Sequence, residues 1–177
     1  AFPEYSGDFG CAWSPSGANA AHLRDWVRQA HRKGRGAEAL LAAGSAVDDA
    51  PTPRGDLELM YRRQLEVDEH SGPGGWPGYF TPEEMDRNNR QHFGYGEDAL
   101  ALAESLLEQG VDRALASLSA AGDAVAVVNP HARVRNAWAR VALPADLFGQ
   151  AFRVVDRSTG VELVFQRFPD TLEILFH

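Results

Sequence analysis

The chain lacks the features that mark a disulfide-rich or membrane-spanning protein. Cys11 is the only cysteine, which excludes an intramolecular disulfide and a thiolate metal cluster. No apolar run approaches the roughly 18–20 residues that a membrane span needs. No basic and hydrophobic leader stands at the N-terminus. We therefore expect no membrane partner. The single cysteine favours the reducing cytoplasm only slightly and leaves the compartment open.

Positive charge is also scarce. The chain has 17 Lys and Arg against 25 Asp and Glu, a formal net charge of −8. A broad nucleic-acid surface needs clustered basic residues, so we expect no nucleic-acid partner. The one local basic cluster, residues 28–35, falls within a predicted helix and is interpreted as a solvated face.

What is present in the first two thirds is helical periodicity. Apolar residues at three- and four-residue spacing predict a helix from about Asn19 to the connector at residues 48–53. Gly34 and Gly36 either break this helix or let a neighbouring element approach closely. A second helix is predicted from Asp56, its expected N-cap, to about Val67.

The third predicted helix has the clearest start in the chain. Thr81-Pro82-Glu83-Glu84 combines an N-cap Thr, a Pro at the first helical position and a Glu three residues after the cap. The apolar pattern continues from there to about Ala120. At about 1.5 Å per residue, a helix of this length suits a rod in a helical bundle.

The last third changes to the period of two that is typical of strands. Residues 156–160 predict a tight hairpin connection, and the strands around it predict an antiparallel meander. Strands are predicted at residues 124–128, 134–143, 152–155, 161–165 and 172–176. A sheet of this size with an open end is incomplete, so we expect the chain to be a piece of a larger protein.

The predicted fold class is therefore α+β, a three-helix bundle followed by an antiparallel β-sheet or sandwich portion. We predict three regions. They are an irregular N-terminal segment at 1–17, a helical bundle domain at 18–121 and a partial antiparallel β domain at 122–177.

The most informative stretch for function is residues 68–80, Asp-Glu-His-Ser-Gly-Pro-Gly-Gly-Trp-Pro-Gly-Tyr-Phe. Two carboxylates and His70 stand where the second helix ends, and Gly and Pro then exclude further helix. Such a loop is a favourable place for a binding site. Trp76, Tyr79 and Phe80 are consistent with a sugar-stacking platform, and equally with an apolar clamp leading into the third helix.

Three segments, in this order along the chain, resemble glycoside hydrolase family 38, the zinc-dependent retaining α-mannosidases. Each is short and resembles a motif that the family carries near its middle helices or at the start of its C-terminal β region. The segments are Ser6–Phe9 with Trp13 shortly after, Asp68–Gly72, and Val127–Pro130 followed by residues 141–144 and 164–166.

The resemblance implies that two domains together form the active site. In this family an N-terminal β/α domain carries the nucleophilic Asp and most zinc ligands, and the helical bundle adds a His, matched here by His70. Trp13 matches a Trp that stacks against sugar, and Asp8 would line the same site. From its place in the loop, Trp76 is also predicted to contact the sugar. The implied partners are an α-mannoside-like glycan and the N-terminal catalytic domain, with which the zinc is shared.

The residues themselves support part of this chemistry. A neutral imidazole is a good zinc ligand, and Glu69 or Asp68 can orient the ring through its other nitrogen. Retaining hydrolysis also needs two carboxyl groups about 5–5.5 Å apart, and no such pair is evident in the sequence. We therefore assign no catalytic residue to this chain and expect the isolated piece to be inactive.

Other interpretations stay open. His70 at a helix C-terminus is also favourable against the helix dipole without any metal. The chain is alternatively a non-catalytic carbohydrate-binding module that uses Trp13, Trp76 and Tyr79. A third alternative is a helical interaction segment that docks a partner through the apolar stripe at residues 102–118.

Overall fold

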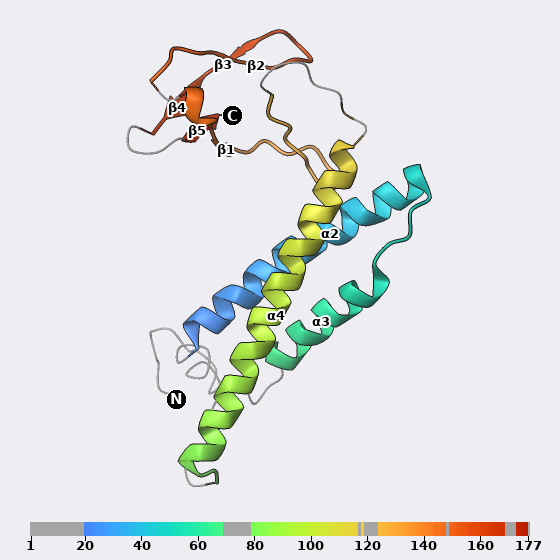
Figure 1. Cartoon of the computed structure of the whole chain (residues 1–177), viewed down its shortest axis with the longest axis vertical. Helices are drawn as coiled ribbons and strands as arrows, with labels where there is room; N and C mark the ends of the chain where they lie inside the picture. Colours follow the sequence, from blue (N-terminus) through green and yellow to red (C-terminus); the bar gives the residue numbers. More distant parts are fainter. Residues whose placement is uncertain are drawn as a thin grey trace, which may run out of the picture. The chain divides into compact units, whose positions relative to one another are not determined.

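The computed structural model describes residues 20–68, 79–116, 118, 124–147, 149–168 and 173–176, the last four by their backbone alone. The chain divides into two compact units, residues 1–118 and 119–177. The described residues of the first unit form a bundle of three helices, and those of the second include short antiparallel strands (Figure 1). The predicted α+β fold class, a helical bundle followed by an antiparallel sheet portion, is thus confirmed.

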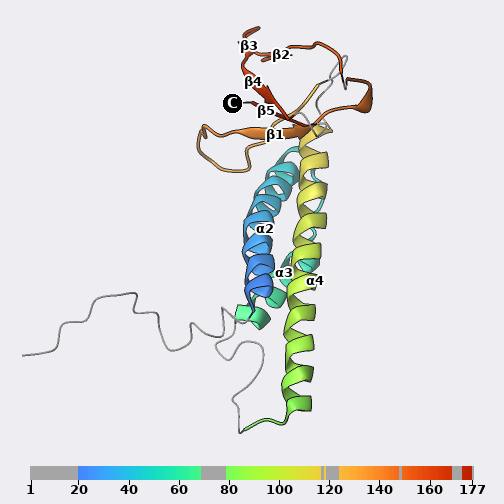
Figure 2. The same cartoon turned by 90° about the vertical axis from the view of Figure 1, so that its left-hand side faces the viewer.

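The bundle consists of α2 (Ala21–Asp48), α3 (Arg54–Asp68) and α4 (Pro82–Leu115). The long helices α2 and α4 run side by side, and the shorter α3 packs against both (Figures 1 and 2). Their apolar stripes face inward because each helix repeats every 3.6 residues.

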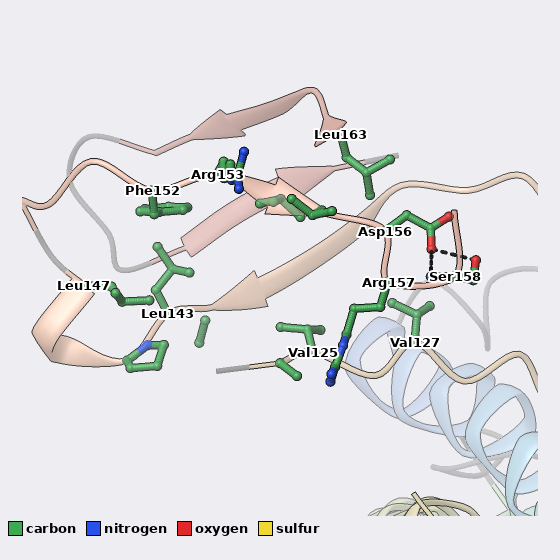
Figure 3. Close-up of a pocket in the computed structure, with 15 residues that line it drawn as sticks. Val125, Val127, Leu143, Leu147, Phe152, Arg153, Asp156, Arg157, Ser158 and Leu163 are labelled. Atoms are coloured by element: carbon green, nitrogen blue, oxygen red, sulfur yellow. Dashed lines mark hydrogen bonds between the residues drawn. The ribbon is translucent and has the colours of Figure 1, made fainter. Parts of the chain in front are cut away.

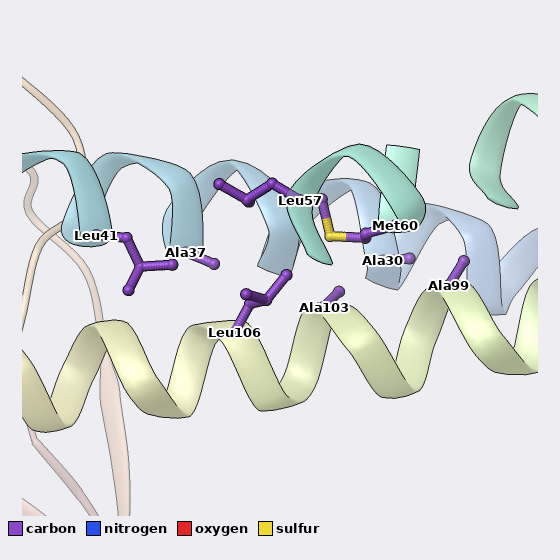
Figure 4. Packing of buried hydrophobic residues seen from close by; sticks show 8 residues of the cluster. All are labelled: Ala30, Ala37, Leu41, Leu57, Met60, Ala99, Ala103 and Leu106. Atoms are coloured by element: carbon purple, nitrogen blue, oxygen red, sulfur yellow. The ribbon is translucent and has the colours of Figure 1, made fainter. Parts of the chain in front are cut away.

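The core of the bundle combines small and large side chains. Alanines dominate the surface where α2 meets α4, which lets these two helices approach closely. Leucines and Met60 fill the space towards α3 (Figure 4). The buried members are Ala30, Ala37, Leu41, Leu57, Met60, Ala99, Ala103 and Leu106.

Gly34 does not break its helix, since α2 is continuous from Ala21 to Asp48. A Cβ atom at Gly34 would lie 2.6 Å from the Met60 Cε atom. The glycine therefore makes room for a core methionine of α3. Of the two predicted roles, close approach of a neighbouring element is the correct one.

The helix starts test the predicted caps. Thr81 caps α4 as predicted: the Glu84 amide donates to Thr81 Oγ1 at 3.2 Å, and Glu84 Oε2 accepts from the Thr81 amide at 2.9 Å. These hydrogen bonds lower the pKa of the Glu84 carboxyl. The prediction for Asp56 was wrong, because α3 already begins at Arg54 and Asp56 lies in its first turn. An acid there still interacts favourably with the helix dipole.

Arg113 near the end of α4 holds the end of α2. Its Nε donates to Asp48 Oδ2 at 2.7 Å, and its Nη2 lies 2.5 Å from Asp48 Oδ1 and from the carbonyl of Ala50. The Arg113 hydrogen bond lowers the pKa of the Asp48 carboxyl from 3.8 to about 2. The connector between α2 and α3 is thereby tied to α4.

This ion pair predicts how the stability of the bundle depends on pH. Because the folded-state pKa of Asp48 is depressed, its contribution is fully present above about pH 3.8 and is lost as the pH falls through about 2. The free energy of unfolding should therefore fall more steeply with acid in the wild-type chain than in Asp48→Asn. Urea titrations followed by circular dichroism across this range measure the difference. Parallel profiles for the two chains would contradict the assignment.

The described residues of the C-terminal unit form five short strands and a 3-10 turn. They are β1 (Ala139–Ala142), η1 (Ala145–Leu147), β2 (Val154–Val155), β3 (Glu162–Leu163), β4 (Phe165–Arg167) and β5 (Glu173–Phe176). One sheet has the order β1-β5-β4, and β2 pairs with β3 alone. The predicted meander was wrong, because β5 pairs antiparallel with β1, with Ala139 opposite Phe176, as well as with β4.

Two further strand predictions need correction. Residues 124–128 form no strand in the structure, and the predicted strand at 134–143 shortens to β1. The predicted hairpin at 156–160 is confirmed: the Asp156 amide donates to the Val161 carbonyl at 2.9 Å, and Gly160 adopts a positive φ of 72°. The turn residues themselves determine the hairpin connection. The alternating apolar pattern of residues 124–128, in contrast, does not specify a neighbouring strand with which they would pair.

Candidate functional site

The residues predicted to form the site lie outside the described part of the chain. Asp8 and Trp13 fall within residues 1–19, and His70 and Trp76 within residues 69–78. The structure does describe the two residues at which these segments join the bundle. Those points are Ala20, just before α2, and Asp68, the last residue of α3.

Both points belong to one end of the bundle. Ala20 and Val67 are buried in a single cluster with Leu23 and Val27, and the exposed fraction of Val67 is 0%. Aromatic side chains of α2 and α4 pack around this cluster. They include Trp26 and Phe93, whose rings meet edge to face with centroids 5.9 Å apart.

Asp68 closes this end of the bundle by pairing with α2. Its Oδ1 accepts from Arg24 Nη1 at 3.1 Å, and its Oδ2 lies 3.4 Å from His31 Nε2. Both carboxylate oxygens thus face α2. The alternative orienting carboxylate, Glu69, lies outside the described residues.

The predicted site residues are close in sequence to this end of the bundle. His70 is two residues after Asp68, and Trp13 is seven residues before Ala20. Because Ala20 and Val67 share one buried cluster, the two segments that carry the predicted site residues join the bundle at neighbouring points.

Tyr79 and Phe80 follow residues 69–78 in the sequence and stand just before Thr81, the N-cap of α4. Tyr79 is 86% exposed and Phe80 is 49% exposed. Neither ring is buried against the bundle, which disfavours the apolar clamp, one of the two alternatives, for these two residues. The first buried side chain of α4 is that of His92, so about three turns of this helix precede its packed part.

The other histidines occupy unrelated places. His22 is exposed on α2, and His92 is buried in α4 with its Nδ1 3.0 Å from the Asn88 carbonyl oxygen. His131 is exposed, and its amide donates to Asn129 Oδ1 at 3.1 Å.

Two hollows were not found from the sequence. One, of about 440 Å³, is lined on the outward face of α2 by Asp25, Arg28, His31, Arg32 and Arg35. The basic run at 28–35 was visible in the sequence, but the hollow depends on how the side chains spread over the helix surface.

The other hollow, of about 690 Å³, lies within the C-terminal unit (Figure 3). Its wall is mostly apolar and includes Val125, Leu143 and Phe152. Asp156 lies at its edge, where Oδ1 accepts from the Ser158 hydroxyl at 2.7 Å and from the Ser158 amide at 2.8 Å. These hydrogen bonds lower the pKa of the Asp156 carboxyl. None of residues 124–147 or 149–168 is fully buried. The apolar side chains that line this hollow are therefore not part of a buried core.

Membrane-spanning helices, metal-binding groups and similarity to known proteins were each searched for. No described helix is long and apolar enough to cross a membrane. Among the described residues, no group of three or more His, Cys, Asp or Glu is placed to hold a metal ion. No protein-family model matches the chain, and neither a curated protein nor a solved structure matches it at a significant level.

Proposed function

We propose that this chain is the middle and early C-terminal region of a retaining, zinc-dependent α-mannosidase-like glycoside hydrolase. In this proposal His70 supplies one zinc ligand, and Asp8, Trp13 and Trp76 contact the sugar. The remaining zinc ligands and the nucleophile belong to an N-terminal catalytic domain. The parent is an enzyme, and the isolated chain is inactive.

One observation carries the proposal: the segments with the predicted site residues begin at the same end of the bundle. Ala20 and Val67 share a buried cluster there, and Asp68 pairs with Arg24 across the helices. A site built from both segments needs such proximity. The order of a helical bundle followed by antiparallel strands also agrees with the domain order that the resemblance implies.

The roles of this chain's residues follow from their chemistry. An imidazole on a short tether from a packed helix end is restricted in position, which favours its use as a metal ligand. The zinc ion would supply Lewis-acid binding of sugar hydroxyls. Indole rings offer flat apolar faces on which a sugar ring can lie.

Zinc titration of the 177-residue chain tests the metal role. Four ligands give structural zinc sites their large binding free energy, so one imidazole alone should bind with a dissociation constant on the order of millimolar. Backbone amide shifts in ¹H–¹⁵N spectra would report such weak binding near His70. His70→Ala should abolish these shifts, and His22→Ala, at an exposed position on α2, should leave them unchanged.

Two results would contradict the proposal. Submicromolar zinc binding by this chain alone would mean that it holds a complete site. Weak shifts that survive His70→Ala would mean that another residue is the ligand.

The exposure of Tyr79 favours a second candidate, a carbohydrate-binding module that acts without metal. Tyr79 is three residues after Trp76 in the sequence, and at 86% exposure it is available for stacking on a glycan. Metal-independent binding of α-mannose oligosaccharides that is lost in Trp76→Ala and kept in His70→Ala would favour this candidate. The helical interaction alternative is less favoured, because Leu106 of its predicted stripe is buried in the bundle and Leu102 packs against the same core.

A further inference from the structure

A group of three arginines that form no ion pair with any described residue lies on the outward face of α2. Arg28, Arg32 and Arg35 are exposed and line the 440 Å³ hollow together with Asp25 and His31. Their spacing of four and three residues places them on one side of the helix, over about 10 Å of its length. No carboxylate within residues 20–68 or 79–116 forms an ion pair with any of them.

The two cations that neighbour this group on α2, Arg24 and Lys33, do have acidic partners. Arg24 contacts Asp68 at 3.1 Å, and Lys33 contacts Glu104 at 2.5 Å. Asp25 is the acid that lines the hollow, and its Oδ2 accepts from the neutral Gln29 Nε2 at 2.7 Å. His31 Nε2 lies 3.4 Å from Asp68 Oδ2.

Like charges at this spacing repel one another and destabilise a helix, and the single carboxylate of Asp25 offsets at most one of the three positive charges. A bound anion would remove that repulsion. Guanidinium groups are planar forks of donors that match tetrahedral oxyanions in pairs of hydrogen bonds. The chain as a whole is negative, so anions are attracted only where positive charge is locally concentrated.

We propose that the hollow on α2 binds the oxyanion group of a phosphate or sulfate monoester, held by Arg28, Arg32 and Arg35. The site is open to solvent, so binding is weak and falls with rising salt concentration. It lies on a helix that the predicted zinc and sugar residues do not use, and it does not depend on the proposed glycosidase role.

The test is a ¹H–¹⁵N titration of the 177-residue chain with glucose 6-phosphate, glucose 6-sulfate and neutral glucose. Saturable shifts of the backbone amides of residues 28–35 and of the arginine side chains are expected with one or both esters and not with glucose. Which ester binds identifies the group that the site takes. Arg28→Gln/Arg32→Gln should weaken binding by about tenfold or more, because two charge-assisted contacts are lost.

A matched variant separates a site from a general effect of charge. Arg54→Gln/Arg62→Gln removes the same charge from exposed positions of α3 and should leave binding unchanged. Equal losses in the two double variants would overturn the proposal, as would equal shifts with glucose or none with either ester. Circular dichroism of both variants checks that the helices remain folded.

Discussion

Truncation of Leu106 to alanine is expected to lower the free energy of unfolding of the bundle by about 2–5 kcal/mol. Leu106 is 1% exposed and lies between α4 and the other two helices, among the side chains in Figure 4. The loss combines the removed apolar contact with the cavity that remains. The neighbouring alanines, such as Ala37 and Ala103, are too small to fill it.

Urea unfolding followed by circular dichroism at 222 nm measures this loss, because the signal comes mainly from the helices. Leu65→Ala is the matched control: Leu65 is 71% exposed on α3, so its truncation should change the free energy of unfolding by less than about 0.5 kcal/mol. Equal effects at Leu106 and Leu65 would show that α4 does not pack as the structure has it.

The second large effect is expected from two glycines of α4 with opposite surroundings. A Cβ atom at Gly94 would meet nothing within 4 Å, so Gly94→Ala should stabilise the bundle by up to about 1 kcal/mol through helix propensity. A Cβ atom at Gly110 would lie 2.9 Å from the Leu40 Cβ atom. That atom is fixed to the backbone of α2, so Gly110→Ala must push the two helices apart.

The propensity gain is the same at both positions, so the difference between the variants measures the cost of the contact. We expect Gly110→Ala to be less stable than Gly94→Ala by about 1–3 kcal/mol, and less stable than the wild-type chain. Thermal and urea unfolding of both variants give this difference. A stabilising Gly110→Ala would rule out the close approach of α2 and α4 at that point.

Leu106 and Gly110 show what helical periodicity can predict. The three- and four-residue spacing of apolar residues correctly predicted three helices, because this pattern reflects which side of each helix is buried. The same pattern gave Gly34 two alternative roles, since a single sequence does not show that Met60 of another helix comes to lie against it. The close approach follows from packing between helices.

The charged residues of the bundle show a similar limit. Asp48 and Arg113 are 65 positions apart, and Arg24 and Asp68 are 44 apart. Neither pair was foreseen, because such contacts depend on where whole helices lie. The capping box of Thr81 and Glu84 was foreseen, because its two residues are three positions apart and interact within one turn.

For the candidate site, too, some features were predicted from the sequence and others came only from the structure. The residue types at 68–80 and the three short motifs led from the sequence to His70, Trp13, Asp8 and Trp76, and these assignments remain predictions. The structure adds that Ala20 and Val67 share one buried cluster. It also adds the arginine-lined hollow on α2, whose volume no spacing rule predicts.

The sequence by itself determined the three helices, the cap of α4, the hairpin at 156–160 and the α+β class, because each depends on interactions between residues close along the chain. Only the tertiary structure decided the sheet order β1-β5-β4, the glycine contacts between helices and the ion pairs that join them. These depend on segments far apart in sequence, whose pairing is selected by the free energy of packing the whole unit and leaves little trace in any local pattern.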